Sequence, residues 1–240
     1  MLPHAFILRE GGRTASFRGL RRTAGSGFCA RVEPLLPTYE RPHWAAGRIV
    51  AGVDEVGRGP LAGPVVAAAV VLPVDGIPEG LADSKTLTAR RRAELDRVIR
   101  GCGRIGIGQA SVEEIDAINI LQATYLAMRR AVAALPVAPA HLLIDGNRLP
   151  PALACEATAI VKGDGCCPSI AAASIVAKCW RDAHMIDLSQ QFPGYGWETN
   201  AGYGSKSHRE ALRNIGVTPH HRRSFRPVHD ILYQDEITTD

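Results

Sequence analysis

The 240-residue sequence lacks several features that mark common classes of protein. It has no run of ~18 apolar residues, so we expect no membrane-spanning helix. Its longest apolar stretch, residues 61–72, is interrupted by Gly63 and Pro64. No pair among its six cysteines has the C-x-x-C spacing that is typical of a structural zinc site. We therefore expect reduced cysteines and a cytoplasmic protein without membrane contact.

Other familiar patterns are also missing. The sequence contains no G-K-[ST] motif of a phosphate-binding loop and no complete dinucleotide fingerprint. It has no internal repeat and no low-complexity tract. What remains is an ordinary foldable composition, with 46% hydrophobic and 22% charged residues. The length fits one large domain, or one domain with an extension.

The first 47 residues differ from the rest. They hold seven arginines against three glutamates and show no periodic apolar face. They lack the apolar core of a secretory signal, although their composition could suit an organelle transit peptide. A disordered basic tail, or a start codon placed too far upstream, is the favoured interpretation. We therefore predict an extension at 1–47, a folded domain at 48–229 and a tail at 230–240.

The net charge of +4 is too small to indicate a nucleic-acid partner by itself. The charge is unevenly distributed, however. The segment from Tyr195 to His229 holds six basic residues, two acidic residues and four histidines. Such a segment is either a solvated charged face or a surface that contacts a polyanion.

Alternating and buried apolar patterns predict five strands, at 49–53, 63–72, 104–110, 141–144 and 157–161. A capping box at Ser111 and Glu114 predicts the start of a long helix, which apolar residues at helical spacing continue. A second helix is predicted at 169–188, and a short one begins the basic tail after Gly204. This order predicts an α/β domain with a mixed sheet.

Four carboxylates occupy positions that could line one crevice. Asp54, Glu55 and Asp145 come at the ends of predicted strands, and Asp182 lies in the later half of the helix at 169–188. In open α/β sheets, functional crevices lie outside the carboxyl ends of strands. Carboxylates gathered there repel one another unless a cation is bound. Because Mg²⁺ and Mn²⁺ prefer oxygen ligands, the pattern predicts a divalent metal site.

Each of these residues also has a simpler interpretation. Asp145 precedes a glycine and could be a turn residue, and Glu55 could be solvated. Arg181 and Asp182 are adjacent on a helix and could form a surface ion pair. Neighbours on a strand point to opposite faces, so Asp54 and Glu55 can share a site only if the strand ends or bulges there.

Gly57-Arg58-Gly59 follows the first acidic pair directly. Glycines on both sides let the backbone approach a ligand, and the arginine could meet a phosphate. A tight turn is the alternative.

These motifs belong to a longer pattern that resembles the ribonuclease HII family, the type 2 ribonucleases H. The resemblance covers roughly residues 49–229. Its segments are Asp54–Val65, Asp83-Ser84-Lys85 with Leu87, Ile144–Asn147, Lys162–Asp164, Ser169–Lys178 with Arg181-Asp182, Gly202–Gly204 with His208, and His221–Pro227.

The resemblance implies a ribonuclease-H-like fold, with a central mixed sheet flanked by helices and a basic, helical C-terminal extension. It implies an endonuclease that cuts the RNA strand of RNA–DNA hybrids, and cuts DNA duplexes on the 5′ side of a single ribonucleotide. Two Mn²⁺ or Mg²⁺ ions would be held by Asp54, Glu55, Asp145 and Asp182, with Asp54 bridging both. Cleavage would leave 5′-phosphate and 3′-hydroxyl ends. We expect the enzyme to act as a monomer.

The resemblance also assigns residues to the substrate. It implies that Gly57, Arg58 and Gly59 meet the 2′-hydroxyl, and that Tyr203 packs on the adjacent sugar. We expect basic side chains to hold the nucleic-acid backbone. These are Arg58, Lys85, Lys178, Lys206 and the tail from Arg222 to Arg226, which includes Arg223.

Two details separate this sequence from its relatives. The type 3 family usually has threonine where Arg58 stands and carries an extra N-terminal domain, so type 2 is favoured. Ala201 stands where type 2 enzymes often have lysine, so one basic contact is missing. The alternatives are a DNA-junction resolvase on the same fold, and a module that binds hybrids without cutting them. The second would be favoured by loss of a carboxylate, and all four are present.

Overall fold

Five strands form one mixed sheet in the computed structural model, which describes residues 34–233. The strand order is β3-β2-β1-β4-β5. The first three strands along the chain pair antiparallel, whereas β4 pairs parallel with both β1 and β5. The strands are β1 (Val50–Val56), β2 (Val65–Val71), β3 (Arg104–Ala110), β4 (His141–Asp145) and β5 (Glu156–Ile160). The predicted mixed α/β sheet and all five predicted strands are confirmed, with shifts of a few residues at their ends.

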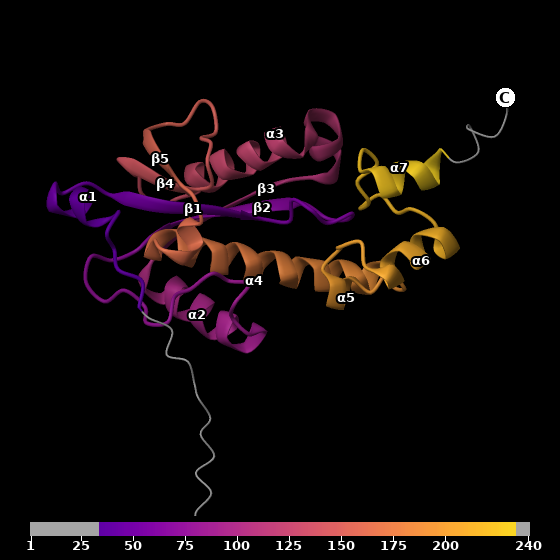
Figure 1. Ribbon diagram of the computed structural model, residues 1–240, viewed down its shortest axis with the longest axis horizontal. Coiled ribbons are helices and arrows are strands. Elements are labelled where there is room, and N and C mark those ends of the chain that lie inside the picture. Colours follow the sequence, from indigo (N-terminus) through magenta and orange to yellow (C-terminus); the bar gives the residue numbers. More distant parts are fainter. Residues whose placement is uncertain (1–33, 234–240) are drawn as a thin grey trace, which may run out of the picture. The chain divides into compact units, whose positions relative to one another are not determined.

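Helices cover both faces of this sheet (Figure 1). They are α1 (Arg41–Ala45), α2 (Ala89–Cys102), α3 (Val112–Ala133), α4 (Pro168–Gln191), α5 (Trp197–Asn200), α6 (Lys206–Ile215) and α7 (Arg226–Leu232), with a 3₁₀ turn η1 (Gly163–Gly165) before α4. The capping box of Ser111 and Glu114 at the start of α3 is confirmed.

Strand β2 shows how the two layers are built. Val65, Ala67 and Ala69 pack into the core beneath α3. Ala68 and Val70 point the other way, into the core beneath α2 and α4. Because side chains alternate across a strand, one continuous apolar run supplies both cores.

Small residues let the helices lie very close to the sheet. A Cβ atom on Gly52 of β1 would lie 2.1 Å from the carbonyl carbon of Ser169, so the first turn of α4 rests directly on that strand. A Cβ atom on Gly108 of β3 would lie 2.3 Å from the carbonyl oxygen of Ala127 in α3. Any side chain at these positions would push a helix away from the sheet.

Helix α3 contains a break that the periodic pattern does not reveal. Asn119 has φ 65° and ψ 164°, outside the helical region. Its side-chain oxygen accepts hydrogen bonds from the backbone N–H groups of Leu121 and Gln122. Asn119 therefore caps a second helical segment, and the predicted single helix is two segments joined at this residue.

Helix α2 was not predicted. Thr88 caps it by accepting a hydrogen bond from Arg91 N–H, and Leu95 and Ile99 are the residues that it buries. Two apolar anchors among many arginines form too weak a stripe to stand out in the sequence.

The predicted boundary at residue 48 is too late. Residues 34–47 contain α1 and pack on the domain: Leu35 contacts the core beneath α2 and α4, and Trp44 contacts the core around Ile170. Glu40 is fully buried. Its carboxylate accepts hydrogen bonds from the backbone N–H and the hydroxyl of Ser169, in the first turn of α4. The remainder of the expected extension, residues 1–33, and most of the expected tail lie outside the described residues.

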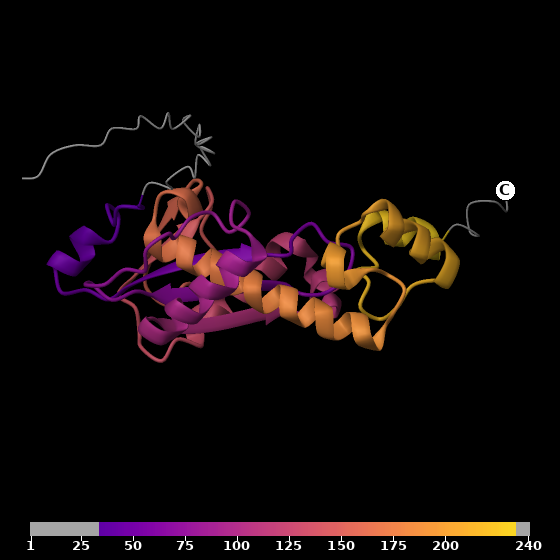
Figure 2. The ribbon, with the colours of Figure 1, turned by 90° about the horizontal axis from the view of Figure 1, so that it is seen from below.

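The last three helices gather around the C-terminal part of α4, which extends beyond the sheet (Figures 1 and 2). Trp197 of α5, Leu212 of α6 and Val228 of α7 share a core there with Met185 of α4 and Leu61 from the β1–β2 connection. This core places the C-terminal helices beside the loop that follows β1. Among the described residues, no helix has the combined length and apolarity needed to cross a membrane.

Candidate active site

The site begins where the pairing between two parallel strands ends. Strands β1 and β4 pair in register, with Val53 opposite Ile144, and the next residues are Asp54 and Asp145. Asp54 is only 5% exposed. Burial raises the pKa of its carboxyl group well above the usual range, and the charges of Glu55 and Asp145 raise it further. The fold thus brings three of the four candidate carboxylates into electrostatic contact.

Asp54 and Glu55 reach this place without a bulge, because β1 pairs regularly with β2 through Val56. Asp54 faces Ser174 of α4, on one side of the sheet, and this hydroxyl partly opposes the rise in its pKa. Glu55 lines a groove with Asp145 and with Tyr125 of α3, on the other side. Burial also raises the pKa of Glu55, although the Arg58 guanidinium, 3.3 Å away, opposes this shift. The carboxylates of Asp54 and Glu55 therefore lie on opposite faces of the sheet, near the end of β1.

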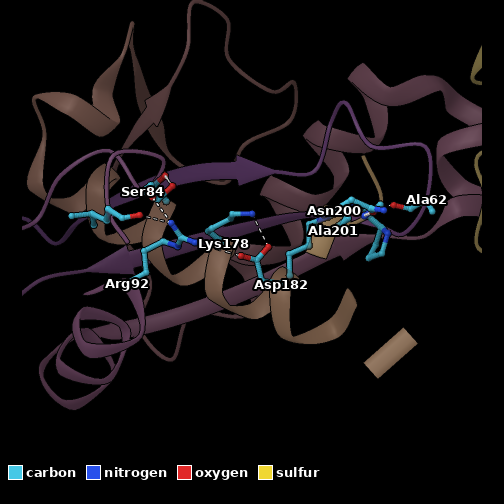
Figure 3. Close-up of polar contacts among 12 residues, drawn as sticks. Ala62, Ser84, Arg92, Lys178, Asp182, Asn200 and Ala201 are labelled. Carbon is cyan, nitrogen blue, oxygen red and sulfur yellow. Dashed lines mark hydrogen bonds and ion pairs between the residues drawn. The ribbon is translucent and has the colours of Figure 1, made fainter. Parts of the chain in front are cut away.

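Asp182 contacts two basic side chains in this structure. Its carboxylate accepts a hydrogen bond of 2.6 Å from Lys178 Nζ, one turn earlier on α4 (Figure 3). Arg92 of α2 approaches it to 3.9 Å. The alternative interpretation, a surface pair with Arg181, is not what forms; Asp182 pairs instead with Lys178, a residue that we expected to hold the substrate. The contact of Arg92 with Asp182 was not predicted, because Arg92 lies on α2, far from Asp182 in the sequence.

Within residues 34–233, no group of three or more acidic, histidine or cysteine side chains is arranged to hold a metal ion. The chemistry of Asp54, Glu55 and Asp145 nevertheless fits one. They offer carboxylate oxygens, which suit hard divalent cations. Because Asp54 is buried beside two like charges, a bound cation would relieve both causes of its raised pKa.

The Gly57–Gly59 segment follows β1, and a buried arginine holds its backbone in place. Arg222 is fully buried and donates hydrogen bonds to the carbonyl oxygens of Gly57 (2.6 Å), Arg58 (2.9 Å) and Gly63 (2.9 Å). We expected Arg222 to contact nucleic acid. This expectation is wrong, because its buried guanidinium donates hydrogen bonds to backbone carbonyl groups. Gly57 has φ +90°, and a Cβ atom there would lie 2.2 Å from Arg181 Nε.

Arg181 fixes the other side of the same region. Its guanidinium donates to the carbonyl oxygens of Pro64, Ala62 and Ala201, at 3.0, 3.0 and 2.8 Å. Figure 3 labels Ala62 and Ala201, two of these three acceptors. Arg181 therefore links α4 to the β1–β2 connection and to the residues just before Tyr203.

Tyr203 lies next to the glycine segment. A Cβ atom on Gly59 would lie 3.6 Å from Cε1 of Tyr203, and the tyrosine is 46% exposed. The ring is therefore open to solvent beside Arg58, whose side chain is 49% exposed.

The remaining predicted substrate contacts are at the surface. Lys85 lies 3.6 Å from Asp164 and 3.9 Å from Asp83. Partial burial lowers the pKa of Lys85, but the negative charges of Asp83, Asp164, Asp54 and Asp145 outweigh it and leave the pKa raised.

Two further predicted contacts lie in the C-terminal part. Lys206 is exposed and pairs with Glu210 at 3.9 Å. The side chain of Arg223 is exposed, while its backbone N–H donates to Asp116. Lys206 and Arg223 are therefore accessible to a polyanion.

The arrangement belongs to a known class of fold. The structure is similar to the crystal structure of the ribonuclease H2 from Pyrococcus horikoshii OT3, with a TM-score of 0.64 and 28% identity, covering 80% of this chain and 99% of that one. It also resembles Bst-RNase HIII in complex with Mn²⁺, with a TM-score of 0.63 and 19% identity, covering 79% and 71% of the two chains. The fold is ribonuclease-H-like, as predicted.

The sequence narrows this class to one family. The family model for ribonuclease HII matches residues 51–228. The ribonuclease HII of Ruegeria pomeroyi (strain ATCC 700808 / DSM 15171 / DSS-3) is 67% identical over 192 residues, which cover 80% of this chain and 82% of that protein. The chain therefore belongs to the ribonuclease HII family and is a ribonuclease H enzyme. The preference for type 2 over type 3 is confirmed.

Proposed function

We propose that this enzyme hydrolyses the RNA strand of RNA–DNA hybrids and also cuts duplex DNA on the 5′ side of a single embedded ribonucleotide. One observation carries the proposal: the acidic residues of β1 and β4 lie at the base of the segment that holds Arg58, and the exposed Tyr203 lies next to this segment. The groups that would cut a phosphodiester thus adjoin the groups that would recognise one sugar.

The catalytic groups would be Asp54, Glu55, Asp145 and Asp182, holding two Mg²⁺ or Mn²⁺ ions. Bound there, the cations would supply an activated water and stabilise charge on the leaving 3′-oxygen, giving 5′-phosphate and 3′-hydroxyl ends. Burial of Asp54 fixes its carboxylate where β1 and β4 stop pairing. The hydrogen bond between Asp182 and Lys178 must be exchanged if Asp182 is to join the set.

Recognition of the sugar would fall to Gly57, Arg58, Gly59 and Tyr203. Arg222 occupies the carbonyl oxygens of Gly57 and Arg58, and so holds the segment in one conformation before substrate arrives. Such preorganisation reduces the cost of ordering the loop on binding. Tyr203 would pack on the neighbouring sugar with its exposed ring.

The exposed basic residues would neutralise backbone phosphates. In our proposal, Lys85, Lys178, Lys206 and Arg223 have this role, and their contribution should weaken as salt increases. The five cysteines among residues 34–233 are free thiols, which supports a cytoplasmic location. We propose that the enzyme acts as a monomer.

The experiment is cleavage of three matched duplexes in the presence of Mg²⁺ or Mn²⁺. One duplex carries a single ribonucleotide, one carries an all-RNA strand and one is all DNA. We expect cutting of the first two, with the single-ribonucleotide strand cut on its 5′ side. Cutting of the all-RNA strand alone would refute single-ribonucleotide recognition, and cutting of the all-DNA duplex would refute recognition of the 2′-hydroxyl.

A further inference from the structure

Two histidines are buried beneath the loop that carries Tyr203. His208 of α6 and His221 of the following segment are both 0% exposed, and Trp197 of α5 packs against both rings. The ring of Tyr195 stacks on Trp197 with centroids 5.1 Å apart. This aromatic enclosure holds both imidazoles away from solvent.

The hydrogen bonds around the two rings define where each proton lies. The indole N–H of Trp197 donates to His208 Nε2 at 3.1 Å. Because an indole nitrogen can only donate, His208 Nε2 carries no proton. In the same way, the backbone N–H of Thr218 donates to His221 Nδ1 at 3.0 Å, so that nitrogen is also unprotonated.

The remaining contacts complete a directed chain. The two Nε2 atoms lie 3.0 Å apart, so the proton between them belongs to His221. A neutral His208 must then carry its proton on Nδ1, which lies 2.9 Å from the carbonyl oxygen of Tyr203. His221 therefore sets the tautomer of His208, and His208 donates to the backbone of Tyr203.

Charge on either ring would oppose this pattern. A proton on His208 Nε2 would face two donors, and one on His221 Nδ1 would face the Thr218 N–H. Burial lowers the pKa of both histidines, and the pKa of His221 falls to about 3. Both rings are therefore neutral at physiological pH.

We propose that His208 and His221 are positioning residues that fix the backbone of Tyr203 and thereby hold its ring beside Gly59 for cleavage. The proposal rests on the function proposed above. Tyr203 is 46% exposed, so the direction of its ring depends on how firmly its own backbone is held. Residues just before it are fixed separately, since Gly202 O accepts from Leu61 N–H at 2.8 Å and Ala201 O accepts from Arg181.

The other backbone hydrogen bonds of Tyr203 are both local. Its N–H donates to the carbonyl oxygen of Asn200 at 2.9 Å. Its carbonyl oxygen also accepts from the backbone N–H of Ser205 at 2.8 Å, a local turn contact. His208 is the side chain that connects this carbonyl to the buried core. A displacement near 1 Å at a positioning group can slow a reaction ~100-fold, so loss of this contact should reduce the rate of cleavage more than the affinity.

Two substitutions of His208 separate positioning from stability. In His208→Gln, the side-chain oxygen can accept from Trp197 and His221, but the donor to Tyr203 is lost. In His208→Asn, the amide can still donate to Tyr203, but Trp197 and His221 lose their acceptor. We expect the glutamine variant to keep its melting temperature and lose ~10-fold or more in kcat, with KM nearly unchanged. The asparagine variant should melt at a lower temperature yet retain kcat when assayed well below that temperature.

His229→Gln is the matched control, because this histidine is exposed on α7. It should change neither kcat nor the melting temperature. If instead kcat follows melting temperature across the His208 variants, so that asparagine is the slower enzyme, the two histidines are only structural and the proposal is wrong.

A second measurement does not depend on activity. In ¹⁵N-labelled protein, NMR should find His208 protonated on Nδ1 and His221 protonated on Nε2, with both rings neutral at pH 7. A proton on His208 Nε2 would overturn the proposal. The kinetic comparison should be made on both the single-ribonucleotide duplex and the all-RNA hybrid. A wild-type enzyme that cuts only the hybrid would refute the proposed recognition of single ribonucleotides, while the variants could still test the histidine pair on the hybrid.

Discussion

Removal of residues 1–46 should destabilise the enzyme, whereas removal of residues 1–33 should not. The sequence alone suggests the opposite for the longer deletion, because the segment shows no periodic apolar face. In the structure, however, the carboxylate of Glu40 accepts hydrogen bonds from Ser169 N–H at 2.9 Å, Ser169 Oγ at 2.8 Å and Cys167 Sγ at 3.0 Å. These groups lie at the N-terminus of α4, which Cys167 itself does not cap.

The size of the effect can be worked out from these contacts. A hydrogen bond to a charged group contributes roughly 1.5–3 kcal/mol, and a carboxylate at a helix N-terminus gains up to about 2 kcal/mol from the helix dipole. Against this, the second carboxylate oxygen of Glu40 is buried without a hydrogen-bond partner. We take a net value of about 3 kcal/mol, to which partial burial of Trp44 adds about 1 kcal/mol. For a domain of this size, a loss of about 4 kcal/mol corresponds to roughly 8–16 °C in Tm.

The assay is thermal or urea unfolding of the full chain, both truncations, Glu40→Gln and a control, Glu198→Gln. Glu198 is exposed on α5, so its substitution should have little effect. Glu40→Gln should account for most of the loss seen on removing residues 34–46. Equal stability of the two truncated proteins would refute the reasoning. A stable Glu40→Gln variant beside an unstable long truncation would assign the stabilisation to Trp44 and its neighbours instead.

Three further substitutions test the site. Asp54→Asn should abolish cleavage while preserving hybrid binding in a gel-shift assay; more than about a tenth of the wild-type rate would show that the carboxylate is misassigned. Tyr203→Ala should slow cutting at a single ribonucleotide by ~100-fold but weaken binding much less, and equal losses in both would contradict a positioning role. The pKa of His221 is lowered to about 3 in the folded state, against about 6.5 in the unfolded state. The unfolded state therefore takes up the proton first, and the free energy of unfolding falls as pH falls below about 6.5. Between pH 6.5 and 5, the unfolding free energy of His221→Gln, measured by urea titration, should therefore fall by about 2 kcal/mol less than that of the wild type. Parallel plots of unfolding free energy against pH for the two proteins would contradict the lowered pKa.

The sheet and the approximate positions of its strands could be predicted because their causes are local in the sequence. Val65–Val71 is apolar throughout and so identifies a strand buried on both faces. Asp54 and Asp145 each follow such a run, and parallel pairing of β1 with β4 brings them together. The long motifs around these residues then identified the family.

The contacts that support the site could not be predicted in the same way. Arg222 and the glycine segment are more than 150 residues apart, and an arginine in a basic run gives no sign that it is buried. Glu40 lies in a segment without periodicity, and its partner Ser169 is 129 positions away. The approach of Arg92 to Asp182 depends on which face of α4 meets α2. Such facts follow from the packing of distant segments, which no local pattern records.

The two buried arginines bear on how the enzyme should respond to ionic strength. Within the described residues, neither Arg181 nor Arg222 forms an ion pair, and both donate to uncharged carbonyl groups. Burial lowers the pKa of Arg181 to about 10 and that of Arg222 to about 9, so both remain cationic at pH 7. Mobile ions screen exposed charges such as Lys206 within about 10 Å at 0.1 M salt, but they cannot enter the protein around a buried guanidinium. Part of the positive potential beneath the glycine segment should therefore persist in concentrated salt, where attraction by the surface lysines has largely vanished.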